Sequence, residues 1–262
     1  MYIILTMLLL GILLGFVGAG GAGFVIALLT LVFDIPIHTA LGTSLAAMAF
    51  TTLSGAYSHY REGNIQLKSG LIVGALACIA SFAGAKVAPF IPEESLHYLT
   101  AGMLFLSAVF MMIKLFVLNE EAEQQPLSSR QLMTRGIILG LVSGMLSGMF
   151  GIGSAPFIQV GLLILLKLSI RQAVGTTMLV IIPISIGGGI GYISEGYVDF
   201  ILLIQILIGT VLGAFIGAKF TRLAPKLLLK SAVLLTPIIA GLLLYFNSIY
   251  TKKADNVMLS AF

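Results

Sequence analysis

Apolar residues run along this chain in stretches about as long as a membrane-spanning helix. Residues 1–33 contain no charged side chain, and similar apolar runs recur to residue 249. Because a helix needs about 20 consecutive apolar residues to cross the hydrocarbon core of a bilayer, the pattern predicts an all-α polytopic membrane protein. The expected segments are 2–33, 39–57, 66–91, 95–118, 132–166, 172–193, 199–224 and 227–249.

Glycine clusters interrupt the two longest segments. The first cluster reads GFVGAGGAGF (Gly15–Phe24) and the second lies in GMLSGMFGIGSAPF (Gly144–Phe157). Glycine inside a helix costs about 1 kcal/mol relative to alanine, so these clusters predict breaks. Each segment is either one long crossing or two half-helices of about 14 residues, which span only about 21 Å. Two such arms would form a hairpin that enters and leaves the membrane on the same side.

The second half of the chain repeats the first at an offset of 133 residues. LGTS at Leu41–Ser44 returns as VGTT at Val174–Thr177, and the GAK that begins at Gly84 returns at Gly217. Two single-residue pairs keep the offset: Pro92 with Pro225, and Gly63 with Gly196. One offset shared by four features predicts an internal duplication. The expected parts are a membrane repeat (1–118), a polar cytoplasmic linker (119–131), a second membrane repeat (132–250) and a C-terminal tail (251–262).

Lysine and arginine distinguish full crossings from hairpins. If both glycine-broken segments cross, each side of the membrane carries seven of these residues; if both are re-entrant hairpins, the split is eleven to three. Only the second split agrees with the excess of positive charge found in cytoplasmic loops. The count predicts both termini outside the cell and three full crossings per half. Since three is odd, the halves are expected to be inverted repeats, each a re-entrant broken-helix hairpin plus three transmembrane helices.

Composition excludes several other classes. Only 9% of the residues are charged and the mean hydropathy is +1.12, whereas a soluble domain carries about 25% charged residues. The single cysteine, Cys78, excludes an internal disulfide and a cysteine-rich metal centre. Basic residues are scattered rather than gathered in a stripe, so no nucleic-acid partner is expected. No cofactor and no metal ion are expected; the partners are the lipid bilayer and a small anion.

The glycine breaks are the candidate binding site. The second half-helices should begin near Gly21–Phe24 and Gly151–Ala155, and a helix start offers free N–H groups and a partial positive charge. Broken helices in inverted repeats commonly form the midplane site of a transporter, and hydroxyls near them can donate to an oxyanion. The expected substrate contacts are Gly20, Gly21, Gly23, Thr43, Ser44, Thr52, Gly151, Gly153, Ser154, Gln159, Thr176 and Thr177. The alternative is structural: small residues also pack helices closely, and hydroxyls also bond to their own helix backbone.

These motifs resemble the TauE/SafE sulfite-exporter family, also called TSUP. The resemblance covers most of the chain and rests on GFVGAGGAGF with LGTSLAAMAFTTLSG, then GMFGIGSAPF with VGTTMLV. It implies a permease, often an exporter, for sulfite, sulfonates, related organosulfur compounds or small carboxylates. It also implies that the glycine turns, Gly42–Ser44 and Gly175–Thr177 contact substrate. The proline expected after the first glycine turn is absent, with Ala27 near its place, whereas Pro156 keeps it in the second half.

The sequence therefore predicts a secondary transporter for a small anion in the plasma (inner) membrane. A passive anion channel is an alternative that motifs do not separate from a carrier. An intramembrane enzyme is disfavoured because the chain has no HExxH motif and no pair of acids suited to acid–base chemistry. No GxxxxGK[ST] motif is present, so the energy would come from gradients or a partner protein. The identity of the anion, the direction, the coupling ion and the oligomeric state are left open.

Overall fold

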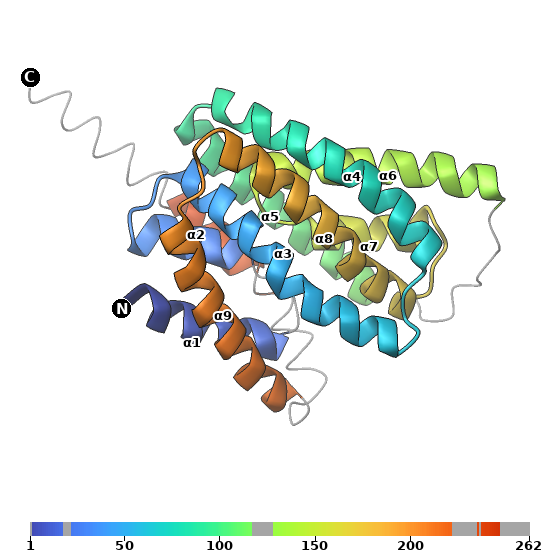
Figure 1. The fold of residues 1–262 in the computed structure, drawn as a ribbon, viewed down its shortest axis with the longest axis horizontal. Helices are drawn as coiled ribbons and strands as arrows, with labels where there is room; N and C mark the ends of the chain where they lie inside the picture. Colours follow the sequence, from blue (N-terminus) through green and yellow to red (C-terminus); the bar gives the residue numbers. More distant parts are fainter. Residues whose placement is uncertain (1, 18–21, 117–127, 222–234, 236, 247–262) are drawn as a thin grey trace, which may run out of the picture.

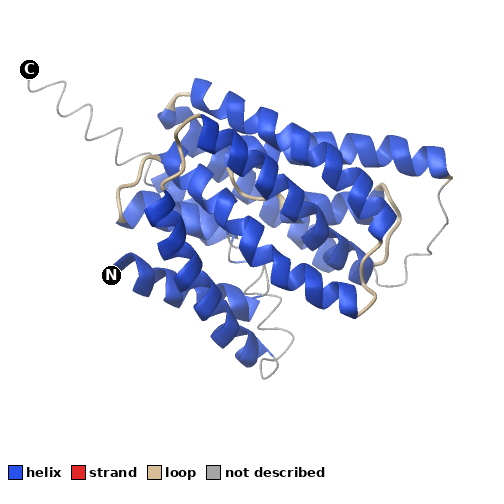
Figure 2. Cartoon of the chain, in the orientation of Figure 1, coloured by secondary structure: helices blue, strands red, loops and turns tan. Residues whose placement is uncertain are grey.

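The chain folds into a bundle of helices. A computed structural model describes residues 2–17, 22–116, 128–221, 235 and 237–246, and all regular structure in these residues is helical (Figures 1 and 2). The helices are α1 (Tyr2–Val17), α2 (Ala22–Val32), α3 (Ile37–Arg61), α4 (Leu67–Val87), the short 3₁₀ helix η1 (Ala88–Phe90), α5 (Glu93–Phe116), α6 (Ser129–Phe150), α7 (Ala155–Ile164), α8 (Ile170–Ser194) and α9 (Phe200–Thr221), followed by the helical residues 237–246.

The expected apolar segments correspond to these helices. Within the described residues, four stretches are long and apolar enough to span a bilayer, in agreement with a polytopic membrane protein: Leu67–Phe90, Glu93–Ile113, Ser129–Phe150 and Arg171–Ser194. The two glycine-broken segments each form two helices, α1 with α2 and α6 with α7. The expected segment 227–249 lies only partly within the described residues, and so does the first glycine cluster, of which residues 18–21 are outside them.

The break between α6 and α7 is a tight turn with left-handed backbone. Gly151 ends α6 at φ 62° and donates its N–H to the Ser147 carbonyl oxygen at 2.9 Å. Gly153 (φ 66°) and Ser154 (φ 46°) follow, and α7 begins at Ala155. Glycine adopts these angles without the steric cost of a Cβ atom, which explains why the cluster ends the helix here.

The arms of this hairpin differ in length more than the sequence suggested. Helix α6 has 22 residues and α7 has 10, compared with the expected 14 or so for each. The extra length of α6 is polar: its first seven residues, SRQLMTR, are mostly exposed, and burial begins at Gly136. The arms return to the same end of the bundle, because Arg135 near the start of α6 donates to the Leu165 carbonyl oxygen just after α7 at 3.0 Å.

Turns in the two halves match at the offset of 133 residues. Helix α3 ends with Gly63 at φ 71° and an Asn64 N–H that bonds the His59 carbonyl oxygen. Helix α8 ends the same way, with Gly196 at φ 78° and a Tyr197 N–H that bonds the Tyr192 carbonyl oxygen. These are glycine caps of the same type, so the Gly63–Gly196 pair found in the sequence marks one turn used twice.

Glycines let helices from different halves pack backbone to backbone. Along α6, Gly144 and Gly148 face the backbone of Ala77 and Ser81 on α4, so α6 runs parallel to α4. Along α9, Gly209 and Gly213 face Ile4, Met7 and Leu8, so α1 runs parallel to α9. Figure 1 shows α4 beside α6 and α1 beside α9, with α3 and α8 between them. The absence of side chains at such contacts is what permits close approach of membrane helices.

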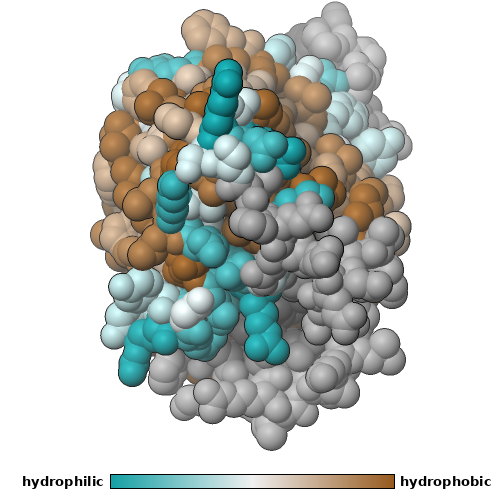
Figure 3. Space-filling model, turned by 90° about the vertical axis from the view of Figure 1, so that its right-hand side faces the viewer, coloured by the Kyte–Doolittle hydropathy of each residue, from teal (hydrophilic) through white to brown (hydrophobic). Residues whose placement is uncertain are grey.

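Charged residues gather at opposite ends of the bundle. One end, where α3 and α7 finish and α4, α6 and α8 begin, is called the basic end and carries Arg61, Lys68, Arg135, Lys167 and Arg171. The other end, where α3, α5 and α9 begin, is called the acidic end and carries Asp34, Glu93, Glu94, Glu195 and Asp199. Figure 3 views the molecule from the basic end and shows hydrophilic residues gathered there beside apolar ones.

Candidate functional site

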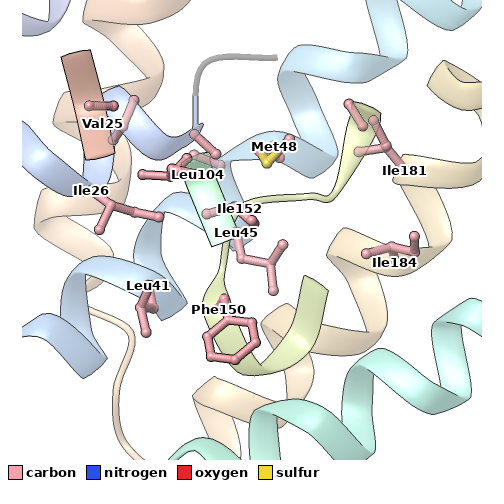
Figure 4. Close-up of a cluster of buried hydrophobic side chains, with 14 of the residues drawn as sticks. Val25, Ile26, Leu41, Leu45, Met48, Leu104, Phe150, Ile152, Ile181 and Ile184 are labelled. Carbon is pink, nitrogen blue, oxygen red and sulfur yellow. The ribbon is translucent and has the colours of Figure 1, made fainter. Parts of the chain in front are cut away.

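The break between α6 and α7 lies inside the apolar core. Side chains from α2, α3, α5 and α8 converge on it, together with Phe150 and Ile152 of the break itself (Figure 4). Helix α3 covers the glycines: a Cβ atom at Gly151 would lie 2.9 Å from the Leu41 Cα, and one at Gly153 would overlap the terminal methyl of Met48. In this conformation the turn is therefore sealed by Leu41 and by the flexible side chain of Met48.

Two carbonyl groups at the end of α6 have hydrogen-bond donors. The last carbonyl groups of a helix have no partner within the helix. Here the Ser147 oxygen accepts from the Gly151 N–H, and the Met149 oxygen accepts from the hydroxyl of Tyr192 on α8 at 3.2 Å. Tyr192 is fully buried, so this bond joins the central helix α8 to the break. The negative end of the broken helix thus has donors supplied by the protein itself.

The amide end of α7 differs. The Ser154 side chain is 1% exposed, does not cap its own helix, and its hydroxyl oxygen has no hydrogen-bond partner. Pro156 sits in the first turn, where a missing N–H costs nothing, and the remaining first-turn amides have no partner within the helix. Gln159 is buried on the second turn. A buried polar group without a partner is rare, and each one calls for an explanation.

Fixed charge is absent from the buried residues around this turn. Among the residues whose side-chain burial the structure describes, no lysine, arginine, aspartate or glutamate is buried. The same residues contain no group of three His, Cys, Asp or Glu side chains placed to hold a metal ion. What the turn can offer a ligand is neutral: N–H groups, hydroxyls and the positive end of the α7 dipole. This set of groups favours a small anion.

The two threonines of the repeated motif lie at opposite ends of the bundle. Thr43 accepts the Asp199 N–H at 3.3 Å, at the start of α9, and Thr176 accepts the Gln66 N–H at 3.0 Å, at the start of α4. Each hydroxyl therefore bonds the first turn of a helix in the other half, and the two contacts are related by the offset of 133. The structure does not bring Thr43 and Thr176 together, and their role as substrate contacts stays a prediction.

Three other predicted hydroxyls bond within their own helices. Ser44 donates to Leu41, Thr52 to Met48, and Thr177 to Ala173, at 3.0, 2.6 and 2.7 Å. Their oxygens retain acceptor capacity, but their protons are used by the helix backbone.

Of the predicted glycines, Gly151 and Gly153 lie in the turn with Ser154. Gly23 lies on α2, where a Cβ atom would overlap the Leu104 side chain of α5. Gly20 and Gly21 are outside the described residues.

The sequence did not single out four other buried hydroxyls. Ser81 on α4, Thr100 on α5, Ser147 on α6 and Ser185 on α8 are buried and have no hydrogen-bond partner. A signal existed for Ser185, which occupies the position of Thr52 in the second half. Ser81 and Ser147 have no hydroxyl counterpart at the repeat offset, so only the packing of α4 against α6 reveals them.

Comparison with known proteins assigns the chain to a family. A protein of Bacillus subtilis (strain 168) described as probable membrane transporter protein YdhB is 69% identical over 246 residues, covering 94% of this chain and 100% of that protein. Probable membrane transporter protein YjnA of the same organism is 30% identical, covering 86% and 91%. Probable membrane transporter protein MJ0441 of Methanocaldococcus jannaschii is 29% identical, covering 87% and 90%. No solved structure matches this chain. The family model for sulfite exporter TauE/SafE matches residues 3–244, and the chain therefore belongs to that family of membrane transporters.

Proposed function

We propose that this transporter is a secondary carrier of a small oxyanion, such as sulfite, a sulfonate or a related organosulfur anion, and that it works as an exporter. The anion binds at the start of α7, where it accepts hydrogen bonds from the Ser154 hydroxyl and from first-turn amides. Gly151 and Gly153 allow the backbone to approach the anion, and Gln159 adds an amide one turn further on.

The observation that carries this proposal is the unpartnered hydroxyl of Ser154. It is buried beside a helix start whose dipole is positive, whereas at the end of α6 the Met149 carbonyl oxygen accepts a hydrogen bond from Tyr192. Fixed charges are absent from the buried residues that the structure describes. The arrangement therefore suits an anion that exchanges its water for neutral hydrogen-bond donors and is then released. A buried lysine or arginine would hold the anion more tightly and slow its departure.

The same proposal accounts for the arrangement of the two halves. The arms of α6 and α7 return to the basic end, whereas α1 runs parallel to α9, which starts at the acidic end. This supports inverted repeats whose hairpins enter from opposite faces, a geometry that alternating access can use. The excess of arginine and lysine at the basic end supports placing that end in the cytoplasm and both termini outside the plasma membrane.

Thr43 and Thr176 belong to the proposal in a secondary role. Each hydroxyl accepts one backbone N–H, yet each still has its own proton to donate. They would meet the anion as it passes the acidic end and the basic end, rather than in one central site.

Counterflow distinguishes a carrier from a channel. Protein reconstituted in vesicles loaded with unlabelled sulfite would be diluted into a trace of radiolabelled sulfite, with sulfoacetate, thiosulfate, sulfate and acetate tested as competitors. A carrier accumulates label above equilibrium before losing it, because exchange is faster than net flux. Monotonic equilibration without overshoot would indicate a channel, and no protein-dependent flux of any of the anions would refute the proposed substrate class.

A further inference from the structure

A buried histidine at the acidic end has contacts that the anion site does not require. His38 lies in the first turn of α3 and is 4% exposed. Its Nε2 lies 3.1 Å from the Ala88 carbonyl oxygen of η1, and its Nδ1 lies 3.5 Å from a carboxylate oxygen of Glu93, at the start of α5. The ring of Tyr197, from the turn after α8, packs against the imidazole with centroids 5.1 Å apart. The imidazole therefore joins four elements of the fold.

Both polar neighbours of this ring are acceptors. A carbonyl oxygen has no proton, so Nε2 must carry one to bond Ala88. An ionised carboxylate has none either, so Nδ1 faces Glu93 favourably only if the ring holds a second proton or if Glu93 is itself protonated. With that second proton the two groups attract each other; without it, the Nδ1 lone pair faces the carboxylate.

We propose that His38 and Glu93 form the proton-binding site that couples proton movement to anion transport. This inference rests on the proposed transport function and adds the coupling ion to it. A proton enters the site from the acidic end. When the site loses this proton, the Nδ1 lone pair of His38 faces the Glu93 carboxylate.

The site is suited to releasing its proton as well as to binding it. A cation in the first turn of a helix opposes the helix dipole, so the start of α3 disfavours a charged ring unless Glu93 balances it. The Glu93 side chain is 60% exposed and is free to turn toward water when the proton leaves.

Other charged groups at this end are engaged elsewhere. Lys86 of α4 pairs with Glu195, in the turn after α8. The Asp199 carboxylate caps the start of α9, and the His97 ring on α5 is bonded to the Glu93 carbonyl oxygen of its own helix. The remaining acids at this end are Asp34, after α2, and Glu94, on α5. The Glu93 carboxylate lies 3.5 Å from the His38 imidazole.

Contacts link the proton site to the anion site. Leu41, one turn after His38, packs on Gly151 of the break, and a Cβ atom at Gly42 would lie 2.5 Å from the Tyr197 carbonyl oxygen. The start of α3 is therefore held between α5, the Tyr197 turn and the break. When His38 separates from Glu93, the start of α3 is released from α5. Leu41, which covers the break, then moves with the start of α3.

The first test measures coupling in vesicles. Purified full-length protein would be reconstituted, and radiolabelled sulfite flux measured with and without an imposed pH gradient. His38→Gln keeps an N–H donor for Ala88 but cannot bind a proton, so it should retain sulfite counterflow and respond to the gradient less than wild type does. His97→Gln is the matched control and should respond as wild type does. Sulfite itself binds a proton near neutral pH, but this effect is common to all variants and cancels in the comparison.

Two outcomes overturn the inference here. The first is a His38→Gln variant whose flux follows the pH gradient as in wild type. The second is a wild-type flux that the gradient does not change.

The second test needs no transport. The chain has three histidines, so nitrogen NMR of protein labelled at histidine can resolve each ring, with His38 identified by its loss in His38→Gln. The pH course of the His38 ring nitrogens should change in Glu93→Gln, while that of His59, at the opposite end of α3, stays the same. If wild-type vesicles move no sulfite, the proposed function fails for that anion, but the NMR spectrum still tests the proton site. A His38 pH course that is unchanged in Glu93→Gln refutes that site.

Discussion

Two sets of buried hydroxyls in this molecule have opposite surroundings. Thr43 and Thr176 occupy equivalent positions in the two halves, and each accepts a backbone N–H from the start of a helix in the other half. Ser154 has a glycine, Gly21, at the equivalent position, and its hydroxyl has no partner. Thr43 and Thr176 therefore join the two halves, whereas Ser154 bonds nothing in the protein and is available for a ligand. Residues kept at the offset of 133 can therefore reflect packing between the two halves of the chain rather than the binding of substrate.

The largest effect is expected where a side chain would enter the contact between halves. Gly175, beside Thr176, faces the Asn64 carbonyl oxygen so closely that any Cβ atom overlaps it. Gly175→Leu should cost more than about 4 kcal/mol and leave little folded protein. Gly102→Leu is the control, because nothing lies within 4 Å of a Cβ atom there. Size-exclusion profiles and melting temperatures of the two variants measure the difference, and equal behaviour would contradict the packing described.

The next effect concerns the threonines themselves. Thr43→Val and Thr176→Val each leave a backbone N–H without an acceptor, which costs about 1–3 kcal/mol per site. Because the two contacts lie at opposite ends of the bundle, the losses should add in the double variant. Thr177→Val, whose hydroxyl bonds only its own helix, should cost less. Chemical or thermal unfolding of the purified variants provides the measurement; a double variant as stable as wild type would show that these bonds contribute nothing.

Removal of the Ser154 hydroxyl should lower anion affinity and leave stability unchanged. Ser154→Ala deletes a group with no partner in the protein, so the melting temperature should stay close to that of wild type. A hydrogen bond to a charged ligand contributes about 1.5–3 kcal/mol, so anion affinity should fall roughly 10- to 100-fold. Ser143→Ala is the matched control, since that hydroxyl is equally buried but donates to Leu139 at 2.6 Å. Titration calorimetry with sulfite compares the two variants. An equal loss of affinity in both would contradict a direct contact between Ser154 and the anion.

The smallest effect is expected for hydroxyls bonded within their own helix. In Ser44→Ala and Thr52→Val, the backbone carbonyls that accepted the side-chain bond keep their helical partners. Stability should change by about 1 kcal/mol or less for Ser44→Ala, the net contribution of one hydrogen bond, and anion affinity should change less than in Ser154→Ala. A selective loss of affinity in Thr52→Val would instead indicate that this hydroxyl turns toward the substrate.

Much of the fold could be predicted from the sequence because it depends on local signals. Hydrophobic runs located the helices, and the glycine clusters located the starts of α2 at Ala22 and of α7 at Ala155. The offset of 133 residues anticipated paired turns such as those at Gly63 and Gly196. The charge count predicts re-entrant hairpins and both termini outside the cell, and this orientation stays a prediction.

The candidate site could be predicted only in part. Ser154 and its glycines were selected because a helix start leaves its mark on the local sequence. The partners of Thr43 and Thr176 lie 156 and 110 residues away, so no local pattern reveals that their hydroxyls accept backbone N–H groups. The same holds for His38, whose neighbours come from η1, α5 and the turn after α8.

The most direct test of this account is calorimetric titration of sulfite into three purified proteins: wild type, Ser154→Ala, and the double variant Thr43→Val with Thr176→Val. We predict that Ser154→Ala loses sulfite affinity at unchanged stability, whereas the double variant loses stability and keeps the affinity of wild type. The opposite result, in which a folded double variant fails to bind while Ser154→Ala binds normally, would contradict the account and make the repeated threonines the substrate contacts.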